Sequence, residues 1–286
     1  MSDGNKRSAD QSAEKLQQPL VDPVSRSPLS AVSVFTVSLL LSSAAAADFC
    51  PERPGQTTPT CTLAPGDYFF EASVIDWSRQ RGGGEQSDDW LYIDSVLRFG
   101  LTDRVEGGIG FTTGGRSRVQ SDVPGATATS SGIGDLSVGF RLGPVIEGSP
   151  FALGFYVTLP TGDVPPGEED WQSGVLFPYS ADLTERLSLG FTPEIDWVPD
   201  AEGNDHHISW GGALGLGFTL SDAFSVSADV SAFADEDPDG TTRSVTTSLS
   251  LAWQVASQLQ LDVGLYRGLD GDGPDIGIYS GLAIGF

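Results

Sequence analysis

The chain has 286 residues, 39% of them hydrophobic, and a formal net charge of −24. This balance excludes nucleic-acid binding, because phosphate contacts require clustered cations. It suits either an acidic surface adapted to salt or a pore that disfavours anions. No cofactor is expected, since the glycine clusters do not form a phosphate-binding loop.

The N-terminus predicts a cleavable export signal over residues 1–47. Four cations precede an apolar run from Val32 to Leu41, and alanines 45–47 supply small residues for cleavage before Asp48. A retained single-span anchor is the alternative, but the run is short for a membrane helix, which needs about 20 apolar residues. Export would place the rest of the chain in an oxidising compartment.

Residues 48–65 are expected to form a short periplasmic lead. Cys50 and Cys61 are the two cysteines of the chain and lie among four prolines. This arrangement suits a disulfide loop in an oxidising compartment.

From residue 66 to residue 286 the dominant pattern is period-two alternation, which marks strands with two chemically different faces. The segment from Ile208 to Leu220 shows it best, with large apolar residues at most even positions and small or polar residues at odd ones. The segments run about 10 to 13 residues, near the length of a tilted membrane-crossing strand. We predict an all-β fold, a transmembrane antiparallel up-and-down β-barrel of about twelve strands. Their approximate ranges are 67–77, 90–101, 104–113, 132–142, 151–160, 174–183, 186–197, 207–220, 223–235, 243–255, 259–267 and 275–286.

The connections between these segments form two alternating classes. Short, similar turns start at Leu101, Leu142, Leu183, Leu220 and Val255, a spacing of 35 to 41 residues that corresponds to one hairpin. The other connections are longer, glycine-rich and acidic, as the outer loops of such barrels are. Both ends of the barrel then face the periplasm, and the localisation is the bacterial outer membrane.

The placement of charged residues is an independent test of the predicted barrel, because the inner and outer faces of each strand were assigned from the apolar residues alone. Asp76 and Arg243 fall on the outer parity, near the outer rim, where a lipid-facing charge costs little. A soluble sandwich has no reason to place charges on its packed face. The other strand charges fall on the inner parity: Glu71, Asp94, Arg98, Glu106, Asp135, Arg141, Asp182, Glu194, Asp196, Asp229 and Asp262.

Aromatic residues mark the two ends of the predicted barrel. Five tryptophans at strand ends beside the long loops predict an interfacial girdle, namely Trp77, Trp90, Trp171, Trp197 and Trp210. The final strand ends on Phe286 with lipid-facing parity. This terminal residue resembles the signal by which outer-membrane proteins are recognised for assembly.

Three strings carry a family resemblance: LRFGLTDRVE at 97–106, GIGDLSVGFR at 132–141 and LPTGD at 159–163. They resemble the outer-membrane transporter family labelled "MetA-pathway of phenol degradation", and the match covers nearly all of residues 66–286. The resemblance implies a passive outer-membrane channel, associated in some members with uptake of aromatic or weakly polar compounds. It implies no catalytic residues.

Twelve strands predict a narrow or partly occluded passage, between small filled barrels and open porins. Arg98 and Arg141 are expected to face Glu106, Asp94 and Asp135 across the lumen. These charges could form a constriction that selects solutes, as charged rings do in channels. The alternative is a set of salt bridges that only holds the shape of the barrel.

One outer loop invites a metal hypothesis. Asp235, Asp237 and Asp239 match the first half of a calcium loop, but Thr246 stands where that motif needs Glu. Divalent ions could bridge the acidic loops or link them to lipopolysaccharide. Solvated acidic turns are the alternative.

The function we expect is passive uptake of a small, aromatic or weakly polar solute into the periplasm. The expected partners are this solute, outer-membrane lipid with lipopolysaccharide, and the outer-membrane assembly machinery. A structural or adhesive barrel with acidic loops is the second hypothesis. A phospholipase is the third, since His207 and Ser209 have a suitable spacing, but both have inner parity and not the lipid-facing one that this chemistry needs.

Overall fold

The computed structural model describes residues 49–121, 126–146, 148–201, 205–270 and 273–286. The predicted export signal, residues 1–47, lies outside these described residues. In the described part, no helix is long and apolar enough to cross a membrane.

Antiparallel strands make up most of the described chain. Within it the strand segments are β1 (Tyr68–Gly82), β2 (Glu85–Thr102), β3 (Val105–Ser121), β4 (Thr127–Gly132), β5 (Leu136–Leu142), β6 (Leu153–Leu159), β7 (Gln172–Leu176), β8 (Tyr179–Asp182), β9 (Leu187–Pro199), β10 (His206–Ser221), β11 (Phe224–Asp235), β12 (Thr242–Ala256), β13 (Leu259–Gly268) and β14 (Ile276–Gly285). The ranges agree with the sequence prediction to within a few residues, except at the outer ends of β1, β2 and β3 and at β4, which lies almost wholly before the predicted start of the fourth strand at residue 132.

The described strands close into one barrel, because β1 pairs with β14 and β9 pairs with β10. β4 and β5 both pair with β3, one after the other, and together form one barrel strand. β7 and β8 pair in the same way with β9. The fourteen described segments therefore make twelve barrel strands, and the predicted twelve-stranded antiparallel barrel is confirmed.

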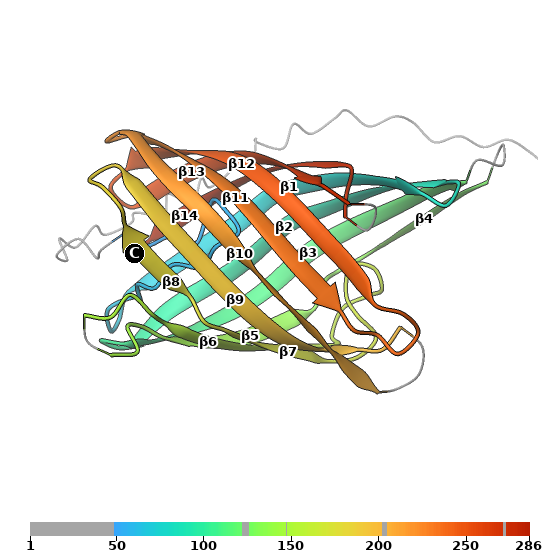
Figure 1. Cartoon of the computed structure of the whole chain (residues 1–286), viewed down its shortest axis with the longest axis horizontal. Helices are drawn as coiled ribbons and strands as arrows, with labels where there is room; N and C mark the ends of the chain where they lie inside the picture. Colours follow the sequence, from blue (N-terminus) through green and yellow to red (C-terminus); the bar gives the residue numbers. More distant parts are fainter. Residues whose placement is uncertain (1–48, 122–125, 147, 202–204, 271–272) are drawn as a thin grey trace, which may run out of the picture. The chain divides into compact units, whose positions relative to one another are not determined.

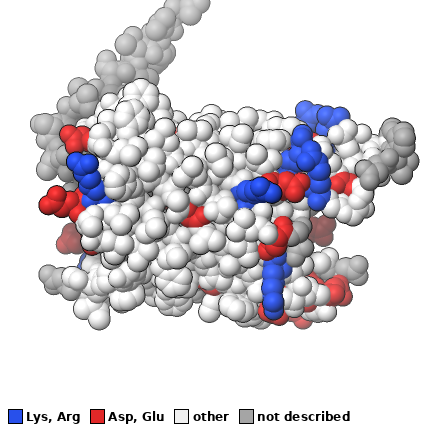
Figure 2. Space-filling view, turned by 45° about the horizontal axis from the view of Figure 1, so that its top comes forward, with Lys and Arg blue, Asp and Glu red and all other residues white. Residues whose placement is uncertain are grey.

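The alternation seen in the sequence separates the inside of the barrel from the outside. In β10, Trp210 and Leu216 are 53% and 46% exposed, whereas Ser209 and Ala213, at odd positions of the same strand, are 9% and 5% exposed. Figure 2 shows the outcome on one face, a broad band dominated by uncharged residues with charged residues gathered toward the two ends. Large hydrophobic side chains are exposed along most of the barrel strands, and an apolar surface of this extent requires contact with lipid.

Asp76 is a correction to the predicted parity. The pairing of β1 with β14 is irregular between Ser73 and Ile75, and Val74 and Ile75 are successive exposed residues. A bulge of this kind moves every following side chain to the opposite face. Asp76 therefore points inward, where it accepts a hydrogen bond of 2.7 Å from the Tyr266 hydroxyl.

The first three strands are longer than predicted, with 15, 18 and 17 residues. Their outer ends, with β4, extend past the other barrel strands as a continuation of the same antiparallel sheet (Figure 1). Polar pairs hold this extension, such as Arg79 Nε with Asp88 Oδ1 at 2.7 Å. The sequence prediction ended these strands where apolar alternation ends, but strand pairing continues beyond that point.

Candidate functional site: the barrel lumen

The segment before β1 lies within the barrel, and we call residues 49–65 the lumenal plug. Cys50 and Cys61 form a disulfide that closes its central loop. Phe49 and Leu63 pack with Phe69 on the inner wall of the barrel. The expectation of a periplasmic lead ahead of the barrel is therefore corrected, because the wall supplies both apolar and charged partners for this segment.

Five charged residues tie the plug to one side of the barrel wall, and we call them the arginine cluster: Glu52, Glu71, Arg98, Glu106 and Arg141. Arg98 binds Glu106 through Nε and Nη2, at 2.9 and 3.0 Å, and binds Glu71 Oε1 through Nη1 at 2.7 Å. The Arg98 and Glu106 side chains are only 3% and 4% exposed. Removing one partner of such a buried pair leaves an uncompensated charge, which costs about 3–5 kcal/mol.

Strand register explains how these residues meet. Glu106 of β3 is directly opposite Arg141 of β5, and the two side chains form an ion pair. Arg98 of β2 is opposite Gly108, two residues from Glu106 on the same inner face. Residues directly or diagonally opposite on one face are within reach of long side chains.

Backbone atoms of the plug complete this arrangement. Arg98 Nη1 donates to the Cys50 carbonyl at 2.9 Å, and the Leu63 N–H donates to Glu106 Oε2 at 3.0 Å. The N–H groups of Glu52 and Arg53 donate to Glu71 at 2.9 to 3.1 Å. The wall carboxylates thus hold the plug by its main chain as well as by its side chains.

The plug also contacts the opposite side of the barrel, so it spans the lumen. Arg53 binds Asp262 of β13 through two nitrogens, at 2.8 and 3.2 Å. The Gln260 side chain donates to the Arg53 carbonyl at 2.7 Å, and the Thr58 N–H donates to Thr192 of β9 at 2.9 Å.

Glu52 is the plug residue whose protonation bears on this contact. Burial alone would raise the pKa of Glu52, but the guanidinium groups of Arg141 and Arg98 outweigh burial and hold the pKa below its ordinary value. Its side chain faces Arg141 Nη1 and lies 3.5 Å from Arg98 Nε. The ionised form of Glu52 therefore stabilises the plugged barrel.

A second segment narrows the lumen nearer the outer end, residues 160–171 between β6 and β7, which we call the inner loop. Asp135 Oδ1 accepts the N–H groups of Thr161 and Gly162 at 2.9 and 2.7 Å, and its Oδ2 accepts the N–H of Glu168 at 2.8 Å. In return, Asp163 Oδ2 accepts the N–H of Ile133 at 3.1 Å. Two of the strings that suggested the family therefore bind one another.

Cavities remain beside these two segments. One of about 180 Å³ lies between the plug and β2, β3, β5 and β6, lined by small residues together with Arg98, Arg141 and Tyr156. Others of about 350 and 380 Å³ lie on further sides of the plug. A fourth, of about 240 Å³, lies between the inner loop prolines and Tyr266.

The predicted constriction residues separate into two groups. Arg98, Arg141 and Glu106 come together as the arginine cluster. Asp94 accepts a hydrogen bond of 2.7 Å from the Thr112 hydroxyl, and Asp135 binds the inner loop. The expectation that these two aspartates face the arginines is corrected, because nearer donors on β3 and on the inner loop occupy them.

The tryptophans of the predicted girdle lie at or near the outer parts of the strands, and Trp171 is the last residue of the inner loop. Trp77 pairs with Trp90 across β1 and β2, and Trp171, Trp197 and Trp210 are exposed. Their role at the lipid interface stays a prediction. Phe286 is exposed and exchanges two backbone hydrogen bonds of 3.0 Å with Tyr68, and its role in assembly also stays a prediction.

His207 and Ser209 do not form a nucleophile and base pair. The two ring nitrogens of His207 contact carboxylates, Nδ1 with Asp200 at 2.9 Å and Nε2 with Asp235 at 2.6 Å. A base for Ser209 would need one of these nitrogens directed at the hydroxyl.

A closed antiparallel barrel with a lipid-facing exterior and a polar lumen defines a bacterial outer-membrane β-barrel protein. The chain belongs to the family described as "Putative MetA-pathway of phenol degradation", whose model matches residues 52–286. The matched range begins inside the plug. A search of curated proteins finds no match.

Several solved structures share the fold. The COG4313 outer membrane channel from Pseudomonas putida F1 is similar with a TM-score of 0.65 and 18% identity, over 82% of this chain and 99% of that one. The β domain of the Bordetella autotransporter BrkA gives 0.53 and 12%, over 78% and 100% of the two chains. The translocator domain of the Neisseria meningitidis autotransporter NalP gives 0.50 and 15%, over 78% and 88%.

Proposed function

We propose that the protein is a passive channel of the bacterial outer membrane for small, weakly polar solutes, with single-ring compounds as the preferred class. The observation that carries this proposal is the partly filled lumen. The plug and the inner loop narrow it, but cavities of about 180 to 380 Å³ remain along the wall. A structural barrel would have no need of such space.

The size of the cavities supports the solute class. An apolar cavity of roughly 150 Å³ holds one benzene molecule, so the cavity beside Arg141 is of a size suited to one ring. Glycines 108, 110, 139 and 154 form much of its wall and leave room for the flat face of a solute. Within the described residues, the buried Nε of Arg141 has no hydrogen-bond partner, which leaves a donor for a solute oxygen.

The charge of the lumen supports a preference against anions. Asp76, Asp94, Asp229 and Asp262 face the interior in addition to the arginine cluster. Carboxylates that line a narrow passage repel anionic solutes and favour cations or neutral molecules. Neutral phenolic compounds are therefore more compatible with the negative charge of the lumen than organic acids are.

A structural or adhesive barrel is the second candidate, since the same fold is shared with autotransporter domains. Its acidic outer loops would then bind partners while the lumen stays closed. We do not propose an enzyme, because both nitrogens of His207 are engaged by carboxylates. The exposed terminal Phe286 supports recognition by the assembly machinery, and the acidic loops support divalent bridging to lipopolysaccharide.

Two measurements test the channel. Planar-bilayer recording should give discrete conductance steps with cation preference. Proteoliposome swelling should be faster with neutral single-ring compounds too polar to cross the bare bilayer than with sugars or organic acids. A folded, heat-modifiable protein that gives no conductance would contradict the channel and favour the adhesive barrel. Equal swelling rates for single-ring compounds and sugars of similar size would contradict the proposed solute preference but not the channel itself.

A further inference from the structure

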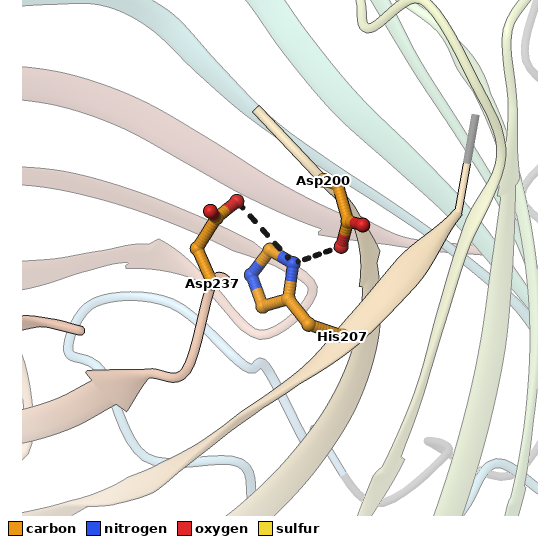
Figure 3. Close-up of side chains that lie close together, drawn as sticks. All are labelled: Asp200, His207 and Asp237. Carbon is orange, nitrogen blue, oxygen red and sulfur yellow. Dashed lines mark hydrogen bonds and ion pairs between the residues drawn. The ribbon is translucent and has the colours of Figure 1, made fainter. Parts of the chain in front are cut away.

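Three side chains meet at the outer mouth of the barrel, away from the plug and the arginine cluster (Figure 3). Asp200 follows β9, His207 is the second residue of β10, and Asp237 follows β11. His207 Nδ1 lies 2.9 Å from Asp200 Oδ1 and 3.6 Å from Asp237 Oδ2. The three ligand atoms all lie within 4.8 Å of one another.

These three side chains are largely shielded from solvent although they lie at the mouth of the barrel. The side chains of Asp200, His207 and Asp237 are 11%, 7% and 9% exposed. Two nearly buried carboxylates directed at one ring nitrogen repel each other unless a cation lies between them.

A single proton does not satisfy this geometry. A proton on Nδ1 makes one N–H group, which serves Asp200 at 2.9 Å and leaves Asp237 at 3.6 Å, beyond hydrogen-bond length. A divalent cation in the same space would contact both carboxylates and the nitrogen together. The spacing fits, because ligands about 2.05 Å from a tetrahedral ion lie roughly 3.3 Å apart, between the two observed distances.

The surroundings hold the three groups in place. Asp237 accepts the N–H of Ala201 through Oδ2 at 2.8 Å and the N–H of Asp239 through Oδ1 at 2.7 Å. On the far side of the imidazole, Nε2 contacts Asp235 Oδ1 at 2.6 Å. A metal-binding histidine usually donates its second ring N–H to a carboxylate, which fixes the tautomer and raises the basicity of the ligating nitrogen.

We propose that Asp200, His207 and Asp237 form a binding site for Zn²⁺ or a similar first-row transition-metal dication, with Asp235 as the positioning residue of the imidazole. One nitrogen and two carboxylate oxygens leave a fourth position for water. An imidazole ligand favours these ions over Ca²⁺ and Mg²⁺, which take oxygen ligands. The ion fastens the β9–β10 connection to the start of the β11–β12 connection at the channel mouth.

This site replaces the calcium loop suggested by the sequence. Asp237 takes part, but Asp239 is exposed and contributes its backbone N–H to Asp237. Asp235 contacts the imidazole and not the ion. The proposal is independent of channel activity, because metal binding is measured on the protein without any solute.

The test is calorimetric titration of the folded protein in detergent with ZnCl₂, using a purification tag without histidine. One Zn²⁺ per chain should bind, with Ca²⁺ and Mg²⁺ at least tenfold weaker. Asp237→Asn and His207→Gln should each abolish binding. Asp235→Asn should weaken it about 10- to 100-fold, as expected for a carboxylate that supports a ligating histidine.

Two neighbouring variants are matched controls. Asp239→Asn removes the same charge from the same loop, and His206→Gln removes the adjacent histidine, so both should bind Zn²⁺ as the unaltered chain does. Heat-modifiable migration on gels verifies that each variant is folded. The proposal is overturned if the unaltered chain binds no Zn²⁺, if Ca²⁺ binds as tightly, or if folded Asp237→Asn binds Zn²⁺ with unchanged affinity.

Discussion

The two ends of the barrel are narrowed by different physical means. Near the periplasmic end, the plug is held by buried ion pairs and by carboxylates that accept its N–H groups. Toward the outer end, the inner loop is held mainly by backbone hydrogen bonds to Asp135. Charge removal should therefore affect the plug far more than the inner loop.

The largest effect is expected from deleting residues 49–63, which removes all but the last two residues of the plug. The arginine cluster would lose Glu52 and its contacts with the Cys50 and Leu63 backbone, and the three cavities that border the plug would merge. Single-channel conductance in planar bilayers should rise several-fold. The deletion variant must keep heat-modifiable migration, and a folded variant with unchanged conductance would show that the plug does not limit passage.

Arg98→Ala should have the largest effect of the point substitutions. It leaves Glu71 and Glu106 buried without their main cation, so the free energy of unfolding should fall by about 3–5 kcal/mol. Denaturant titration in lipid vesicles measures this loss.

Arg186→Ala is the matched control, since Arg186 is exposed in a short turn and its loss should stay within about 0.5 kcal/mol. If conductance and ion preference are unchanged in Arg98→Ala while stability falls, the arginine cluster holds the plug but does not select solutes.

Asp135→Asn should have a moderate effect that is confined to the inner loop. The amide keeps one oxygen acceptor for three N–H donors and loses the charge, which costs about 1–3 kcal/mol. Current recordings should show more frequent fluctuation between conductance levels. Glu169→Gln removes the same charge from an exposed position of the same loop and is the control. Equal current fluctuation in both variants would contradict the role of Asp135 in holding the inner loop.

The smallest effect is a response to acid. The pKa of Glu52 is lowered in the folded protein, so its contribution is present above the ordinary value near 4.5 and is lost as pH falls through the lowered pKa. Conductance should therefore increase below about pH 4.5. Glu52→Gln should show part of this increase at neutral pH and a weaker response to acid, and an unaltered acid response would exclude Glu52 as its cause.

The barrel could be predicted from the sequence because lipid and lumen impose opposite chemistry on alternate residues. In β10 this constraint acts on every position, so the predicted range of the strand and its predicted inner and outer faces were correct. The parity failed at Asp76, because a bulge at Val74 adds one residue without any change in composition. Such an addition becomes visible only when the neighbouring strand is placed beside it.

The plug was missed because residues 49–65 have no alternation, and proline-rich segments are compatible with many conformations. A signal was available in the charges. Of the eleven charges on the predicted inner parity, nine are acidic and only Arg98 and Arg141 are basic. This excess of acidic residues over basic ones on the inner parity indicates that a cation from another segment enters the lumen. Arg53 of the plug is such a cation and binds Asp262.

The proposed metal site of Asp200, His207 and Asp237 could be predicted only in part. Asp237 was a candidate, but Asp200 and His207 lie on either side of the preceding outer connection, between β9 and β10, and meet Asp237 because β10 pairs with both β9 and β11. Strand pairing brings neighbouring outer connections together, so side chains from two connections meet that lie far apart in the sequence.

The place where the plug joins the wall has a consequence for biogenesis. The plug leads directly into β1, and β1 meets β14 at the junction that makes the sheet a cylinder. Because the plug is covalently joined to β1, at one edge of this junction, we expect the plug to be enclosed in the lumen when β1 and β14 pair. The protein would then enter its membrane with its lumen already narrowed, and a cell making many copies would not be exposed to wide open pores during insertion.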